Sequence, residues 1–329
     1  MIAAAKEWTK HWARIGLRAP RIAKDTFYDL RRFIRHSTAV ESGDGAAQLR
    51  AIIIRKAHNI EKGLSLPDPR PLFGFAQLRD LVRFTERHMR LHGENEVTDI
   101  AHAVVRAYLD FNRQKEASDP YLETLERFVA NGRDTRREVG GVTGHQAVDR
   151  PALDPVTLTR FIRSRTSVRN YRPEPVPEAM LAEAAACAAR APAVCNRQFG
   201  RVWHTSDRER IAQMLNVQGG ARGFLETVPT LLMVTTDLSA YTGDERYQSW
   251  IDGGLFAMNL LLGLEAQGIS SCCLNWSKGR QTDRAMRAVA PVTESENIIM
   301  LVACGFASDE ARVPVSTRQP AGYFLNRIP

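Results

Sequence analysis

Long apolar runs are missing from this chain of 329 residues. No stretch approaches the roughly eighteen consecutive apolar residues that a membrane-spanning helix needs. The first residues also lack the apolar segment and small-residue cleavage site of a secretory signal. An apolar fraction of 44% and a charged fraction of 25% are ordinary for a globular protein. The composition therefore predicts a cytoplasmic protein without a transmembrane helix, long enough for two domains.

Cysteine is scarce and shows no metal-binding spacing. The chain has five cysteines, all in its second half: Cys187, Cys195, Cys272, Cys273 and Cys304. No CxxC or Cys/His pattern surrounds them, and two adjacent cysteines cannot easily form an ordinary disulfide with each other. We therefore expect no metal site, a reducing compartment, and thiols that serve mainly as small core residues.

Positive charge is concentrated at the start of the chain. Residues 1–36 hold nine Lys or Arg against three acidic residues, which accounts for six of the eight net positive charges. Trp8, Trp12 and Ile15 recur at helical spacing, so a helix here has an apolar stripe opposite a basic face. Such a helix can pack on the rest of the protein or make a peripheral contact with the inner face of a membrane. No nucleic-acid module accompanies the charge, and we expect no nucleic acid as partner.

The first half of the chain reads as helical. Helical patterns span residues 47–62, 75–92 and 96–131, the last one interrupted near Pro120. Residues 133–153 resemble a linker, because their glycines do not follow a strand and open a helix. We therefore divide the chain into a helical region (1–132), this linker (133–153) and a second domain (154–329).

The most informative part of the sequence lies just after residue 164. Arg165, Thr166, Ser167 and Arg169 place two guanidinium groups and two hydroxyls within five residues, a donor set that matches a phosphate. After one helix come Asn196 and Gln198, whose amides both donate and accept hydrogen bonds. That second pair suits the carbonyl and imide edge of a flavin ring better than it suits a phosphate.

The second half alternates helices and strands. Helices are expected from Asp154 to about residue 165 and at 177–190, 207–215, 251–266 and 281–290; strands are expected at 201–205, 230–236, 270–275 and 297–305. Gly253 and Gly254 should let the central helix, 251–266, pack closely. The pattern predicts an α+β fold in which helices cover one mixed sheet.

The order of these motifs, from Arg165–Arg169 through Asn196 and Gln198 to Gly268–Trp276 and Leu301–Phe306, resembles the FMN-dependent nitroreductase family over roughly residues 156–320. The segment His58–Leu64 is similar to an N-terminal extension of nitroreductase-like proteins from bacterial polysaccharide gene clusters. The resemblance implies a homodimer with FMN at the subunit interface. It also implies that NAD(P)H reduces the flavin, which then reduces a small-molecule acceptor in a ping-pong cycle.

Family roles can be carried over residue by residue. The resemblance implies that Arg165, Thr166, Ser167 and Arg169 hold the phosphate and ribityl end, joined by Ser316 and Arg318 near the C-terminus. It places Asn196 and Gln198 against the ring. It assigns to the segment Leu274, Asn275 and Trp276 a backbone N–H that contacts flavin N5. No catalytic side chain is implied, because the flavin performs the chemistry.

One corner departs from the family pattern. Many relatives have Pro-Trp where this chain has Phe199-Gly200, and a basic residue is common in place of Thr166. An alternative therefore stands beside the enzyme: a non-enzymatic flavin-fold scaffold, or partner protein, in a membrane-associated polysaccharide biosynthesis assembly. A flavoenzyme specialised for a sugar, a peptide or the flavin itself is a third reading.

Overall fold

The computed structural model describes residues 2–39, 43–133, 139–148 and 151–328; for residues 2–15, 17 and 146 it describes the backbone alone. It has the expected α+β fold. The strands are β1 (Gly200–Thr205), β2 (Thr230–Asp237), β3 (Ser270–Asn275) and β4 (Glu296–Gly305). They form one sheet in the order β1-β2-β4-β3, and every neighbouring pair is antiparallel. Among the described residues, the parallel part of the expected mixed sheet is a single bridge between Ser167 and Ser271.

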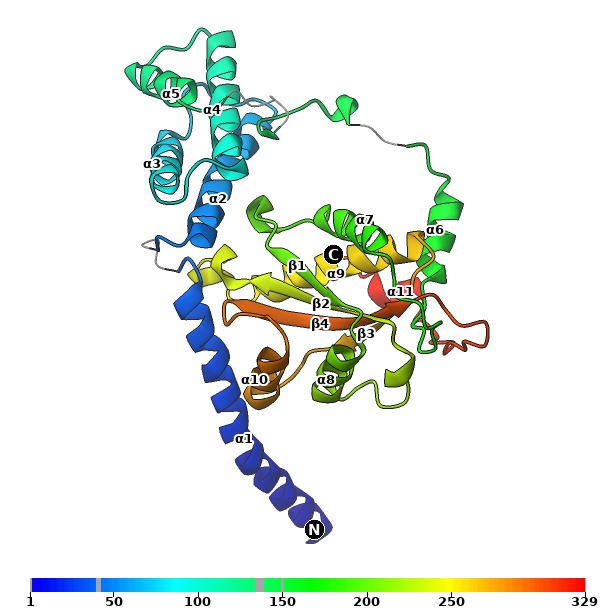
Figure 1. The fold of residues 1–329 in the computed structure, drawn as a ribbon. Coiled ribbons are helices and arrows are strands. Elements are labelled where there is room, and N and C mark those ends of the chain that lie inside the picture. The colour runs from blue at the N-terminus through cyan, green and yellow to red at the C-terminus, as the bar shows by residue number, and fades with distance from the viewer. Residues whose placement is uncertain (1, 40–42, 134–138, 149–150, 329) are drawn as a thin grey trace.

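Helices cover both faces of this sheet (Figure 1). The helices of the second half are α6 (Pro155–Ser164), α7 (Glu178–Ala189), α8 (Arg208–Gln218), α9 (Gln248–Ala266), α10 (Arg280–Val289) and the short α11 (Ala321–Phe324). Helices α7 and α9 share one apolar core with Leu232 and Val302, and α8 and α10 share the other with Leu231 and Leu301. The alternation of strand side chains explains the division, since successive residues face opposite sides.

Glycine sets the spacing of the central helix α9. A Cβ on Gly253 would lie 2.5 Å from Ile299, and one on Gly263 would lie 3.0 Å from Cα of Ala184 in α7. The close packing predicted for Gly253 is confirmed. The prediction for Gly254 is wrong, because a Cβ there meets nothing within 4 Å. Gly254 lies on the outer face of α9.

The first half contains helices only, within its described residues. They are α1 (Ile2–His36), α2 (Ala46–Leu64), α3 (Phe75–His92), α4 (Glu96–Gln114) and α5 (Pro120–Ala130). Helices α2 to α5 form a bundle of their own at one end of the sheet (Figure 1). The interruption near Pro120 is confirmed: Asp119 caps α5 by accepting from the N–H of Tyr121 at 2.8 Å.

Two earlier predictions fall partly outside the described part of the chain. The side chains of Trp8, Trp12 and Ile15 are among those not described, so their stripe stays a prediction. The linker 133–153 includes residues 134–138 and 149–150, which are also outside it; its other residues hold one short 3-10 turn, His145–Ala147. The division into domains likewise stays a prediction. Of the helices described, none combines the length and hydropathy needed to span a bilayer.

Candidate functional site

The predicted phosphate-binding residues lie on the segment that leads from α6 to the sheet. Val168 donates its N–H to the carbonyl of Ser271 at 3.1 Å, and this bond attaches the segment to the outer edge of β3. The buried hydroxyl of Tyr171 donates to the carbonyls of Val168, at 2.6 Å, and Ala303, at 3.1 Å. Burial raises the pKa of Tyr171, so the hydroxyl stays protonated and keeps both bonds. The segment is thus rigidly placed.

The donors on this segment are not used inside the chain. Within the described residues, the side chains of Arg165, Thr166 and Ser167 form no hydrogen bond or ion pair, and Arg169 reaches only the carbonyl of Ser167, at 3.4 Å. The buried hydroxyl of Ser271 beside them also lacks a partner there. Two guanidinium groups without a carboxylate attract an anion, and hydroxyl groups complete a donor set for phosphate oxygens.

Strand β3 continues from this cluster with free backbone donors. It is an edge strand that pairs with β4 on one side. Only alternate residues of β3 point their backbone groups toward β4 and exchange hydrogen bonds with it. Because the carbonyl of Ser271 points outward to Val168, the same alternation turns the N–H groups of Cys273 and Asn275 outward as well. Asn275 is four residues beyond Ser271, roughly 13 Å along a strand. A phosphate-binding cluster and outward N–H groups therefore share one edge.

The side chains of Leu274 and Trp276 point into the core instead. Both are 6% exposed, and the indole of Trp276 donates to Asp283 at 3.2 Å. Their side chains therefore do not face a ligand at this edge, and the same alternation points the N–H of Leu274 toward β4. Asn275 is exposed, and its carbonyl accepts from the side chain of Gln218 at 3.0 Å.

Asn196 and Gln198 lie on a strained loop before β1. Three residues here have left-handed backbone angles: φ is 48° at Cys195, 52° at Asn196 and 56° at Gln198. Asparagine tolerates this region, but cysteine and glutamine adopt it at a cost, and such strain persists where the surroundings enforce it. Gln198 donates to the side-chain oxygen of Asn196 at 2.8 Å, so the two amides act as a pair.

The residue that enforces this conformation is Arg197, which the sequence analysis overlooked. Its side chain is 1% exposed and hydrogen-bonds to the carbonyl of Val194 at 3.1 Å, to the carbonyl of Ala240, and to the carboxylate of Glu245 at 2.6 Å. The pKa of Glu245 is lowered, because the bonds and charge of Arg197 outweigh the opposing effect of burial. Asp252 of α9 adds a second anchor by accepting from the N–H of Val194 at 3.2 Å.

The helical region packs against the same loop. Phe199 is 6% exposed and packs in one cluster with Phe33 of α1, Ala51 of α2 and Tyr241. The guanidinium of Arg50 lies 5.9 Å from the centre of the Phe199 ring. Thr38, between the two helices, donates its N–H to the carbonyl of Tyr241 at 2.8 Å. The first half of the chain is therefore part of the wall that holds Asn196 and Gln198.

These contacts give both residues of the Phe199-Gly200 departure a structural role. Phe199 supplies the surface on which the helical region docks. A Cβ on Gly200 would lie 2.7 Å from the ring of Phe256 in α9, so the site requires glycine. Neither residue could be interpreted from the sequence, since their partners are far away along the chain.

The two groups of predicted flavin contacts lie at opposite corners of the sheet. Ser271 of β3 pairs with Cys304, near the end of β4. Gly200 of β1 pairs with a residue of β2 that in turn pairs with Asn297, near the start of β4. Cys304 is seven residues beyond Asn297, which is roughly 23 Å along the strand. Moreover, β1 and β3 are opposite edges of the sheet. One chain does not bring Arg165 and Asn196 together.

Ser316 and Arg318 lie on the exposed C-terminal segment. Arg318 donates to the carbonyl of Ser316 at 2.7 Å, and Ser316 has a positive φ of 46°. Within the described residues, no contact joins either of them to Arg165 or Asn196. Their predicted role is left untested by this arrangement.

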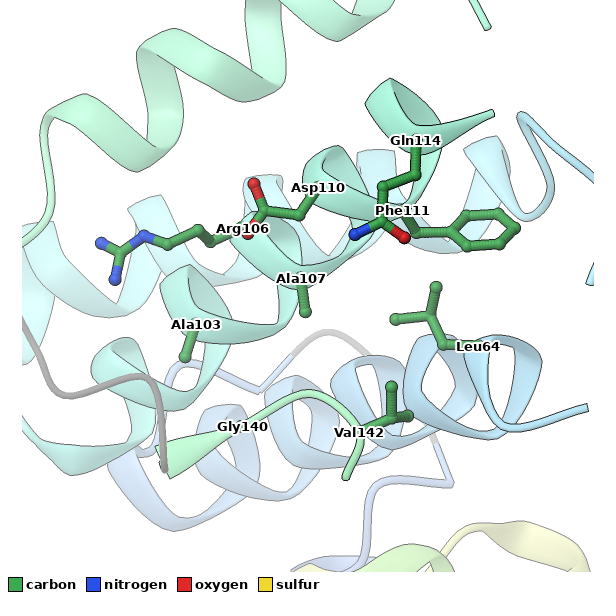
Figure 2. A pocket seen from close by; sticks show the side chains of 9 residues that line it. All are labelled: Leu64, Ala103, Arg106, Ala107, Asp110, Phe111, Gln114, Gly140 and Val142. Atoms are coloured by element: carbon green, nitrogen blue, oxygen red, sulfur yellow. The ribbon is translucent and has the colours of Figure 1, made fainter. Parts of the chain in front are cut away.

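The segment His58–Leu64 borders a pocket in the helical region through Leu64. Glu61 hydrogen-bonds His58 at 3.1 Å and accepts from the N–H of Gly141 at 3.0 Å, which fastens the described part of the linker to α2. Figure 2 shows the resulting pocket of about 290 Å³, between α2, α4 and residues 140–142. It is lined by Leu64, Ala103, Arg106, Ala107, Asp110, Phe111, Gln114, Gly140 and Val142. His58, Glu61 and Leu64 thus have structural roles in the helical region.

Comparison with known proteins identifies the second domain. Residues 162–221 and 205–306 match the model of the Nitroreductase family. A relative named NADH dehydrogenase, from Thermus thermophilus, is 27% identical over 211 residues, which cover 54% of this chain and 94% of the relative.

Two solved structures show similarity over the same half. A nitroreductase-like protein from Streptococcus mutans aligns with 53% of this chain and 98% of its own, at 17% identity and a TM-score of 0.46. A nitroreductase with bound FMN from Bacteroides fragilis aligns with 52% and 98%, at 16% identity and a TM-score of 0.42. Because these TM-scores are below 0.5, the assignment rests on the sequence match.

Residues 162–306 therefore match the nitroreductase family, and the resemblance seen in the sequence is confirmed. An NAD(P)H-dependent flavin oxidoreductase is the enzyme class that this match and the named relative support.

Proposed function

We propose that the protein is a homodimeric FMN-dependent oxidoreductase that takes a hydride from NADH or NADPH and passes electrons to a small-molecule acceptor in a ping-pong cycle. One observation carries the proposal. Arg165, Thr166 and Ser167, whose side chains have no partner within the described residues, lie with Arg169 at one end of the β3 edge, and the outward N–H groups of β3 continue from there. The edge thus offers a phosphate site and, about 13 Å further, donors for a ring.

The residues present fit FMN chemically. Guanidinium and hydroxyl groups bind and orient the phosphate, and outward N–H groups of β3 donate toward the ring edge. When bound, FMN supplies the hydride-accepting and electron-donating chemistry. The amide pair Asn196 and Gln198 orients the ring by accepting from and donating to its polar edge, and Arg197 holds that pair in place.

A second copy of the chain is needed to complete this site. Since Arg165 and Asn196 lie at opposite corners of one sheet, the loop of one subunit must meet the β3 edge of the other. Apolar side chains stand exposed on α6, on α9 and the turn before it, and on the C-terminal segment, as a dimer surface requires. They are Val156, Leu158, Ile162, Tyr247, Trp250, Ile251, Leu255, Met258, Val313, Val315, Tyr323, Phe324, Leu325 and Ile328.

Subunit complementation tests this arrangement. One variant carries Arg165→Glu, which reverses charge in the phosphate cluster; the other carries Asn196→Ala with Gln198→Ala, which removes the ring contacts. Each homodimer should lose FMN. A mixed dimer, purified through two different tags, has one site with both defects and one intact site, so it should retain about one FMN per dimer.

The control is the exposed neighbour Arg163, whose change to Glu should leave the FMN content unchanged. Mixed dimers with no more FMN than the homodimers would show that Arg165 and the Asn196 pair do not meet across an interface. A monomeric protein that keeps its FMN would contradict the two-chain site directly.

A further inference from the structure

Helix α1 presents a different chemistry on each of its sides. One side is docked: Tyr28 donates to Asp283 of α10 at 2.8 Å, and the buried Arg32 donates to the carbonyl of Glu294 at 2.9 Å. Asp25 accepts from the N–H of Arg280 at 3.0 Å. These three contacts lie along one stripe of the helix and fix it against the second domain.

The opposite side of α1 is apolar and uncovered. Phe27, Leu30 and Ile34 follow each other at i, i+3 and i+7, so they share one face of the helix. Their exposed fractions are 67%, 45% and 61%. Figure 1 shows that the N-terminal part of α1 runs past α10 and beyond the sheet. The stripe therefore lies on a projecting helix, and we call it the α1 stripe.

A basic groove runs beside the α1 stripe. It has a volume of about 710 Å³ between α1 and α10 and is lined by Ala23, Lys24, Phe27, Tyr28, Arg31, Arg280 and Arg284. Two of its basic residues come from each helix. Arg284 lies 5.3 Å from the centre of the Tyr28 ring. The neighbouring carboxylates are already paired: Asp25 lies 3.7 Å from Arg280, and Asp283 lies 2.8 Å from Arg287. The groove as a whole is strongly positive.

We propose that the α1 stripe and this groove form a binding surface for an anionic membrane. The apolar stripe would enter the boundary between headgroups and acyl chains while Lys24, Arg31 and Arg284 meet lipid phosphates, which is the arrangement of interfacial amphipathic helices. Charge complementarity selects this partner: the exposed apolar residues border cations, and the 36 N-terminal residues carry an excess of six positive charges. The second domain takes part through α10.

Vesicle binding tests the proposal on the full-length protein. Wild type is mixed with vesicles of equal parts phosphatidylglycerol and phosphatidylcholine, and with vesicles of phosphatidylcholine alone. Binding to the first is expected and should weaken as salt rises, because the contact is partly electrostatic. Binding to the second should be at least tenfold weaker.

Three variants separate the contributions. Lys24→Gln with Arg31→Gln removes two charges and should weaken binding to the anionic vesicles roughly 30-fold. Phe27→Ser with Ile34→Ser should also weaken it, through the loss of buried apolar area. The control, Arg90→Gln with Lys115→Gln, removes two exposed charges from the bundle and should bind like wild type.

All substituted residues are exposed, so circular dichroism should match wild type in each variant. Anionic vesicles that fail to bind wild type would overturn the proposal. So would equal losses in the groove variant and the bundle control, since that result would show attraction by net charge alone. Inorganic phosphate that abolishes vesicle binding at constant ionic strength would instead identify a soluble phosphate site, which also contradicts a membrane surface.

Discussion

Replacing Arg197 by methionine should destabilise the protein far more than the same replacement of an exposed surface arginine. Methionine keeps the apolar part of the side chain but removes the donors to the carbonyl of Ala240 and the carboxylate of Glu245, whereas the carbonyl of Val194 still accepts from the backbone N–H of residue 197, at 3.2 Å. Leaving a buried acceptor unsatisfied costs about 1–3 kcal/mol. Glu245 is 22% exposed and still accepts from the N–H of Thr242, so its share is smaller. We expect a net loss of about 3 kcal/mol.

Urea unfolding measures this loss, with Arg113→Met as the matched control. Arg113 also forms a short ion pair, 2.8 Å to Glu126, but its side chain is 59% exposed. Exposed pairs contribute about 0–1 kcal/mol, so the control should unfold almost like wild type. If Arg197→Met and Arg113→Met lower the free energy of unfolding equally, Arg197 does not hold the loop. If Arg197 holds the loop of Asn196 and Gln198 in place, Arg197→Met should also lower FMN affinity.

Two further predictions concern packing and pH. The pKa of Asp283 is lowered: burial, the largest single influence, raises it, but the bonds and charge of Arg287, with the Tyr28 hydroxyl, outweigh it. The stabilisation that ionised Asp283 provides is therefore present above its pKa in the unfolded chain, about 3.9, and is lost as pH falls through its pKa in the folded protein. Unfolding of wild type and Asp283→Asn should differ most near neutral pH and converge in acid; a constant difference would contradict this. Gly263→Ala should lower the free energy of unfolding by about 1–3 kcal/mol through its clash with α7, whereas Gly16→Ala, with open space around it, should raise it by up to about 1 kcal/mol. Equal effects at the two glycines would refute the packing argument.

Local patterns predicted the elements of this fold well, because each depends on neighbours along the chain. Alternation and apolar runs located all four strands, and caps such as Asp154, which accepts from the N–H of Thr157 at 2.9 Å, located helix starts. The outer position of Gly254 was not predictable, since a glycine pair on a helix does not reveal which member faces a neighbour.

The site was predictable as residue types but not as an arrangement. The donor chemistry of Arg165 and Ser167 can be read from the sequence, and neither side chain has a hydrogen-bond partner in the part of the chain that the structure describes. The separation of Asn196 from them depends on strand order, which no local pattern encodes. The role of Arg197 depends on Ala240 and Glu245, which are more than forty residues away in the sequence. From the sequence alone Arg197 therefore looks like an ordinary polar loop residue, although its side chain is buried and bonded to both.

The visible absorption spectrum of the purified protein, before and after anaerobic addition of NADH or NADPH, shows whether the protein binds a flavin that a nicotinamide nucleotide reduces. We expect a flavin band in wild type that bleaches with one of the two nucleotides, and no flavin band in Arg165→Glu. A flavin band that neither nucleotide bleaches would contradict the proposed hydride transfer and favour the scaffold alternative. A colourless wild-type protein that does not take up added FMN would contradict the assignment of the β3 edge as the flavin site.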